Sequence, residues 1–121
     1  RKEDYLGIDI LPEMVEAAIL RRPGWHFEEG DIMNQNPHWA ADYVVASGLF
    51  QFKKPLSTLE NLWSLCRKAV AVNFLRDGKR DENVLYPDVV LRECLFITPY
   101  VTLRADYLPN DFTLYLYKEQ P

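Results

Sequence analysis

Cysteine, histidine, glycine and long apolar runs are all scarce in this chain of 121 residues, and each scarcity excludes something. Two cysteines cannot form a disulfide framework or complete a four-ligand zinc site alone. The two histidines have no carboxylates at ligand spacing around them, so we predict no metal site. The longest apolar runs, residues 43–46 and 69–72, are far too short to cross a membrane, and no secretory signal is visible at the start.

Blocks of basic residues are also missing. The net charge is −4, and the ten basic residues that follow position 31 are matched by ten acidic ones. Lysine and arginine occur singly or in scattered pairs and form no block, which argues against a nucleic-acid backbone as the main partner. We therefore expect a cytoplasmic protein with no nucleic-acid or membrane partner. Cys66 and Cys94 are interpreted as small core residues in a reducing compartment.

What the chain does contain is an alternation of strand-like and helix-like segments. Strands are predicted at residues 5–10, 25–29, 43–46 and 69–75, and the apolar run 43–46 is typical of a strand buried on both faces. Helices are predicted after Pro12, after a capping box at residues 57–60, and at residues 88–96; a hairpin is predicted at 100–108 and 112–117, and a solvated loop at 76–82. This order indicates one α/β domain, residues 1–121, with the four parallel strands in one sheet and an antiparallel hairpin.

Ligands of such sheets bind beyond the carboxyl ends of the strands, which directs attention to three places. Asp9 ends the first predicted strand; its carboxylate either accepts hydrogen bonds from two ribose hydroxyls or merely complements the following helix dipole. Asp31 follows the second strand, and Gly30 before it would let a ligand approach the backbone closely. In one interpretation Asp31 accepts a hydrogen bond from an exocyclic amine of the ligand while Ile32 packs against a flat ring. In the other, these residues form a plain turn.

The third place is the segment from Ala46 to Gln51, which follows the third predicted strand. Small residues there leave room for a ligand and Ser47 offers a hydroxyl, although a tight strand exit without a ligand explains the same pattern. A hydrolytic serine is excluded because no G-x-S-x-G elbow surrounds Ser47 and no histidine is placed for a triad. The aromatic residues that gather after position 86 are interpreted mainly as strand-packing residues.

Together, and in this order, the segments YLGIDILPEMVEAA, EEGDIM and DYVVASGLFQF resemble class I S-adenosylmethionine-dependent methyltransferases, which have a Rossmann-like fold. The tail VTLRADYLPNDFTLYLYK is similar to the C-terminal hairpin of a bacterial subgroup. The resemblance implies S-adenosylmethionine as cofactor. It assigns cofactor binding to Asp9, Ile10, Asp31, Ile32, Ala46, Ser47 and Gly48. It places Phe50, Gln51 and Asn73 toward the methyl acceptor, and it identifies no catalytic base.

Two departures from the family pattern shape what we expect. Leu11 stands where the family has a capping serine or threonine, so a side-chain helix cap is lost. The five glycines are never two apart, so the G-x-G turn is missing, and with it the family's first strand, first helix and N-terminal cap. We therefore expect the C-terminal part of a longer methyltransferase, with weak or undetectable cofactor binding by these residues alone. A D-x-G-x-G run encoded in frame before Arg1 would support this prediction.

Two other interpretations remain open. The first is a non-catalytic methyltransferase-like remnant that acts through self-association or a partner, because a missing central strand exposes strand edges that favour homo-oligomers. The gap between strands 5–10 and 43–46 would be closed by direct pairing, by a neighbouring chain or by displacement of residues 1–31. The second is a nicotinamide-nucleotide domain, which the missing G-x-G-x-x-G and the Glu-Gly-Asp run disfavour. The acceptor, a small molecule or another methyl acceptor, is not identified.

Overall fold

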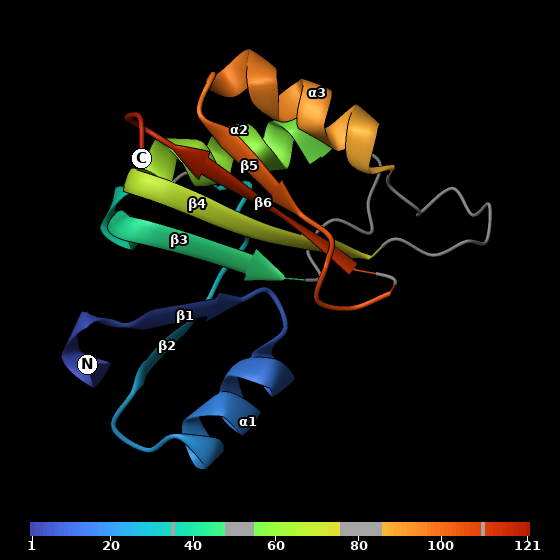
Figure 1. The fold of residues 1–121 in the computed structure, drawn as a ribbon. Coiled ribbons are helices and arrows are strands. Elements are labelled where there is room, and N and C mark those ends of the chain that lie inside the picture. Colours follow the sequence, from blue (N-terminus) through green and yellow to red (C-terminus); the bar gives the residue numbers. More distant parts are fainter. Residues whose placement is uncertain (35, 48–54, 76–85, 110) are drawn as a thin grey trace. The chain divides into compact units, whose positions relative to one another are not determined.

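The structure is a computed structural model that describes residues 1–34, 36–47, 55–75, 86–109 and 111–121, and it divides the chain into two compact units (Figure 1). The N-terminal unit is Arg1–Trp39 and the C-terminal unit is Ala40–Pro121. The single domain that the sequence indicates stays a prediction. No helix in the described ranges is long and apolar enough to cross a membrane.

The N-terminal unit is a β-α-β arrangement. Its elements are the 3-10 helix Lys2–Asp4, β1 (Leu6–Asp9), α1 (Pro12–Arg21), β2 (His26–Glu29) and the 3-10 helix Pro37–Trp39. The strands are parallel, with Asp9 opposite Glu29 at their carboxyl ends. Pro12 occupies the first turn of α1, where its missing N–H costs nothing. Gly24 follows this helix with φ +86°, a conformation that other residues rarely adopt, and it turns the chain toward β2.

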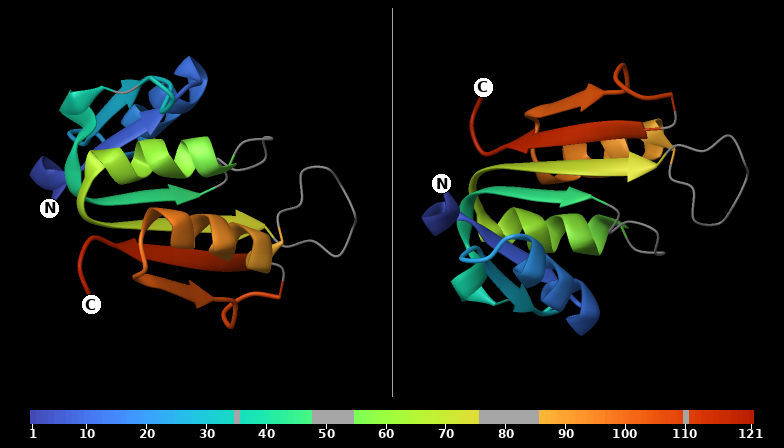
Figure 2. Two further views of the ribbon diagram at one scale, coloured as in Figure 1. Left: turned by 90° about the horizontal axis from the view of Figure 1, so that it is seen from above. Right: turned by 90° about the horizontal axis from the view of Figure 1, so that it is seen from below.

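The C-terminal unit is a four-stranded sheet with two helices. Its elements are β3 (Ala41–Ser47), α2 (Pro55–Leu65), β4 (Cys66–Leu75), α3 (Pro87–Ile97), β5 (Val101–Arg104) and β6 (Asp111–Tyr117). The strand order is β3-β4-β6-β5; β3 and β4 are parallel, and β6 is antiparallel to both of its neighbours. Figure 2 shows α2 and α3 on the same face of this sheet.

The core lies between that face and the two helices. Alternate residues of β6 are fully buried, as the period of two in a strand requires: Phe112, Leu114 and Leu116. Phe74 of β4 stacks on Phe112 with ring centroids 5.0 Å apart. The helices contribute Leu59, Leu62, Val90 and Cys94, all with at most 1% of their surface exposed. Lys118 closes the end of α2: its Nζ donates to the Trp63 carbonyl at 3.0 Å and lies 3.8 Å from the centroid of that indole.

The α/β class, the crossover helices and the C-terminal hairpin are confirmed, whereas several finer predictions were wrong. The strands form two sheets rather than one, which sequence periodicity cannot reveal because it defines strands and not their partners. Helix α2 begins at Pro55, so Ser57 lies inside its first turn and does not cap it. Strand β3 is buried on one face only: Tyr43 and Val45 are 65% and 78% exposed, because α2 and α3 both cover the other face. The predicted loop at 76–82 lies outside the described residues.

Candidate functional site

Asp9 closes β1 with a turn that occupies only one of its carboxylate oxygens. The Leu11 N–H donates to Oδ1 at 2.9 Å, and Oδ2 accepts no hydrogen bond from any described residue. Leu11 is the N-cap residue of α1 and makes no side-chain cap, as the sequence indicates. Ile10, between them, is 60% exposed. The end of β1 therefore presents a carboxylate oxygen without a partner among the described residues and an apolar side chain.

Asp31 repeats this arrangement two residues beyond β2. Its Oδ1 accepts from the Met33 N–H at 2.9 Å, and its Oδ2 has no partner among the described residues. The half-buried Ile32 lies in this turn. The Gly30 N–H donates to the Asp9 carbonyl at 2.9 Å, so the two turns are joined at the same edge of the parallel pair. One edge of the N-terminal unit thus offers two free carboxylate oxygens and two isoleucines.

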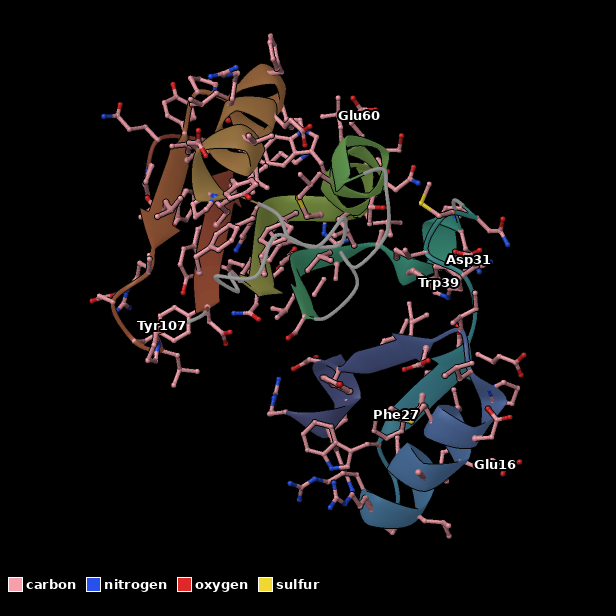
Figure 3. The ribbon with its side chains drawn as sticks, turned by 90° about the vertical axis from the view of Figure 1, so that its right-hand side faces the viewer. Glu16, Phe27, Asp31, Trp39, Glu60 and Tyr107 are labelled. Carbon is pink, nitrogen blue, oxygen red and sulfur yellow. The ribbon has the colours of Figure 1, made fainter. Side chains whose placement is uncertain are left out.

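Trp39 is a residue of this edge that sequence reasoning missed. A Cβ built on Gly30 would lie 2.5 Å from the Trp39 ring, so the close approach that we attributed to a ligand is made by this indole. Figure 3 shows Trp39 and Asp31 in the N-terminal unit. The indole Nε1 donates to Glu28 Oε2 at 2.7 Å, and His26 bonds the other oxygen at 2.9 Å. These hydrogen bonds, that of His26 first, hold the pKa of Glu28 below its usual value.

An apolar hollow of about 220 Å³ lies between β1, β2 and α1 of the same unit. Its lining residues are Tyr5, Gly7, Ile8, Asp9, Met14, Val15, Ala18 and Phe27. Figure 3 labels Phe27, which lies beside α1. Apart from the Asp9 carboxylate the hollow offers few polar groups, so it marks incomplete packing under the helix and we assign no ligand to it.

The other predicted residues belong to the C-terminal unit, where the structure describes three of them. Ala46 is buried and faces the helices, whereas Ser47 is exposed on the opposite face. The Ser47 hydroxyl donates to Asn73 Oδ1 at 3.4 Å, and these two residues are register partners at the carboxyl ends of β3 and β4. Gly48, Phe50 and Gln51 lie outside the described residues.

Asn73 also contacts two residues that the sequence did not single out as site residues. Its Nδ2 donates to the Tyr107 hydroxyl at 2.7 Å and to Thr113 Oγ1 at 3.4 Å. Figure 3 shows Tyr107 on the connection that follows β5. The alternation of the sequence continues to residue 108 and predicts a strand that includes Tyr107, but β5 ends at Arg104.

Two other kinds of chemistry find little support among the described residues. Within the described ranges, no three histidine, cysteine or acidic side chains lie close enough to hold a metal ion. Cys66 and Cys94 are both buried and unpaired, as predicted for core residues. Burial raises the pKa of the Cys94 thiol to about 12 and raises that of Cys66 as well, so neither thiol ionises readily.

Comparison with known proteins identifies the fold. No family model matches the chain. A Mycobacterium tuberculosis (strain ATCC 25618 / H37Rv) protein, provisionally named methyltransferase Rv1506c, is 44% identical over 62 residues. These residues are 51% of this chain and 36% of that protein, so the match spans little more than a third of the relative's length.

Several solved structures similar to the chain are methyltransferases. The plantazolicin methyltransferase BpumL, solved with a triazolic desmethylPZN analog and SAH, matches 97% of this chain and 68% of its own length with a TM-score of 0.75 at 15% identity. Magnesium protoporphyrin IX methyltransferase from Synechocystis PCC 6803, solved with SAM, matches 94% and 59% with a TM-score of 0.72 at 12% identity. N-methyltransferase NodS from Bradyrhizobium japonicum WM9 matches 95% and 73% with a TM-score of 0.69 at 14% identity. The chain has the fold of class I S-adenosylmethionine-dependent methyltransferases.

Proposed function

We propose that this chain is the cofactor-binding part of a longer S-adenosylmethionine-dependent methyltransferase. The observation that carries the proposal is the pair of aspartate turns: Asp9 ends β1, Asp31 lies two residues beyond the parallel β2, and each has one carboxylate oxygen without a hydrogen-bond partner among the described residues. A nucleoside offers matching donors, namely two vicinal ribose hydroxyls and an exocyclic amine. The fold and the methyltransferase relatives support the same assignment. The non-catalytic remnant is the less favoured alternative.

The residues divide into three groups by the part of the reactants that they would hold. Asp9 would accept hydrogen bonds from the ribose hydroxyls, Asp31 would accept from the adenine amine, and Ile10 and Ile32 would pack against the flat ring. Ala46, Ser47 and Gly48 would line the methionine end, and Phe50, Gln51 and Asn73 would face the acceptor.

In this proposal the chain contributes to catalysis by positioning the cofactor and the methyl acceptor. When bound, S-adenosylmethionine would supply a methyl group to the acceptor's lone pair, with the electron pair of the carbon–sulfur bond left on sulfur and the acceptor's proton released to water. The residues of the chain hold the two reactants in line, which lowers the barrier by removing the entropy cost of their encounter. We assign no general base. Because the chain lacks a G-x-G turn, we expect residues 1–121 alone to bind the cofactor weakly or undetectably.

Calorimetry on the full-length protein tests the proposal, with S-adenosylhomocysteine as the probe. Asp9→Asn keeps an oxygen for the Leu11 N–H but removes the negative charge toward the ribose. We expect it to weaken binding about ten- to a hundredfold, the usual effect of losing a charged hydrogen-bond partner. Glu16→Gln is the matched control, because this exposed residue of α1 removes the same charge from the same unit (Figure 3).

Equal affinity of wild type and Asp9→Asn would remove Asp9 from the site. Absence of S-adenosylhomocysteine binding by the full-length protein would overturn the proposed function, and a stable dimer in light scattering would then favour the non-catalytic remnant.

A further inference from the structure

A polar row crosses the sheet of the C-terminal unit at the carboxyl ends of its parallel strands. Ser47 of β3 is the register partner of Asn73 in β4, Asn73 of Thr113 in β6, and Thr113 of Arg104 in β5. Because side chains alternate along a strand and Val72 and Phe74 are buried toward the helices, the row points to the opposite face. The preceding row on that face contains Val45, Ala71, Tyr115 and Thr102, so within the parallel strands β3 and β4 the polar side chains begin at the carboxyl ends.

Hydrogen bonds connect the row through Tyr107. Asn73 Nδ2 donates to the Tyr107 hydroxyl at 2.7 Å, and the Tyr107 and Thr113 hydroxyls are also hydrogen-bonded to each other. If these hydrogen bonds served only to hold the connection between β5 and β6 against the sheet, the contacts of Tyr107 with Asn73 and Thr113 would be sufficient. The row continues, however, to Ser47, whose side chain has no other hydrogen-bond partner among the described residues than Asn73. Four polar side chains from three strands and a connection therefore form one network.

The charge of the row is already balanced among its described members. Arg104, at the end of the row, is held by Asp106: its Nε lies 3.2 Å from Oδ1 and its Nη2 lies 3.3 Å from Oδ2. The remaining groups are a carboxamide and three hydroxyls, which donate and accept hydrogen bonds without charge. Such a set suits a neutral polar group. It offers neither a free cation to a carboxylate or phosphate nor a free anion to an ammonium group.

We propose that this row, with the Tyr107 hydroxyl at its centre, binds an uncharged hydroxyl group of the methyl acceptor. The assignment to the acceptor rests on the proposed function. There, Ser47 lines the methionine end of the cofactor, from which the methyl group is transferred, so the row would lie beside the acceptor. Tyr107 contacts the acceptor's hydroxyl group directly, whereas Asn73 and Thr113 are positioning residues that fix the orientation of the phenol. A neutral hydroxyl acceptor is thereby selected over charged analogues of the same shape.

The test measures binding of three small probes of similar shape to the full-length protein by NMR. The probes are benzyl alcohol, which is neutral, benzoate, which is negative, and benzylamine, which is positive at pH 7. The Asn73 side-chain amide signals, assigned by their loss in Asn73→Ser, report binding at the row. We expect benzyl alcohol to shift these signals and to bind at least about tenfold more tightly than either charged probe, since a charge left without a partner is costly.

Two tyrosine variants test whether the Tyr107 hydroxyl is the group that binds benzyl alcohol. Tyr107→Phe keeps the ring and should weaken benzyl alcohol about 2- to 10-fold, the range for one neutral hydrogen bond, while calorimetry gives unchanged S-adenosylhomocysteine affinity. Tyr100→Phe is the control, because the Tyr100 hydroxyl has no hydrogen bond within the described part of the chain.

The inference is overturned if S-adenosylhomocysteine binds but the Asn73 signals do not move with benzyl alcohol, if the three probes bind equally, or if Tyr107→Phe binds benzyl alcohol as wild type does. A protein that does not bind S-adenosylhomocysteine at all would instead refute the proposed function on which the acceptor assignment rests.

Discussion

The two units of the molecule differ sharply in how much they bury. Among the described residues, the C-terminal unit holds thirteen of the fourteen buried hydrophobic side chains, and the N-terminal unit holds only Trp39. The reason is architectural: two helices cover one face of a four-stranded sheet in the C-terminal unit, whereas one helix and two parallel strands make up most of the N-terminal unit. In the latter, Leu20 is 82% exposed and Ile10 is 60% exposed.

This difference assigns separate tasks to the two units. A two-stranded parallel sheet with one helix is marginal alone, because parallel strands are normally covered on both faces. The C-terminal unit has a complete core and carries the polar row. The N-terminal unit carries the two aspartate turns and a hollow of about 220 Å³. Its stability should therefore depend strongly on what it binds, since a ligand of the folded form stabilises it by mass action.

The largest expected effect contrasts one leucine from each unit. Leu114→Ala opens a cavity in the core of the C-terminal unit and should lower the free energy of unfolding by about 2–5 kcal/mol. Leu20→Ala removes the same atoms from an exposed position of α1 and should change it by no more than about 0.5 kcal/mol. Urea unfolding followed by circular dichroism measures both. Similar losses for the two variants would contradict the contrast between the units.

A smaller effect is expected where the N-terminal unit does pack. In Gly30→Ala the new Cβ would lie 2.5 Å from the Trp39 ring, so the indole must move, at a cost of about 1–3 kcal/mol. Urea unfolding followed by Trp39 fluorescence, with the other tryptophans replaced by phenylalanine, measures the loss. In a Trp39→Leu background the smaller side chain leaves room, so urea unfolding followed by circular dichroism should show a smaller cost there. An equal cost in both backgrounds would mean that Trp39 does not pack on Gly30.

Two glutamates give the units opposite responses to pH. Hydrogen bonds from His26 and then Trp39 lower the pKa of Glu28, so its stabilising contribution is present above the ordinary glutamate value and is lost as pH falls. Burial raises the pKa of Glu93, one of whose oxygens has no hydrogen-bond partner among the described residues, so stability is lost as pH rises through that pKa.

Thermal unfolding of two matched variants between about pH 4 and pH 8 checks these signs. At pH 7 Glu28→Gln should melt below wild type and Glu93→Gln above it, and both differences should shrink toward the acid end. A lower melting temperature for Glu93→Gln at pH 7, or a constant difference for either variant across the range, would refute the corresponding assignment.

The same contrast explains which features the sequence could predict. Strand and helix periodicity placed the elements well in both units. Strand ends drew attention to Asp9, Asp31 and Ser47, whose role in a site stays a prediction, whereas Asn73 came only from the family resemblance. Trp39 was not predicted as a buried residue because it lies in a short 3-10 helix, where no periodicity marks a buried position. Tyr107 was not predicted as a site residue because the apolar alternation continues past the end of β5 and suggests a strand-packing role.

The sequence could not predict which strands pair or which faces of a strand are covered, for a different reason. A run of β-branched residues, as in β3, is equally compatible with one or two covered faces, because burial depends on elements distant in sequence. The division of the strands between two sheets is likewise decided by which edges find partners and not by the residues of any one strand.

Hydrogen–deuterium exchange of the full-length protein, with and without S-adenosylhomocysteine, tests the central claim most directly. The Leu11 and Met33 amides donate to Asp9 and Asp31, so ligand binding at these carboxylates should slow exchange in residues 9–12 and 30–33. Helix α3 should remain unchanged, and Asp9→Asn should reduce the protection. Unchanged exchange in both turns at a saturating ligand concentration would contradict the assignment of the cofactor to this edge.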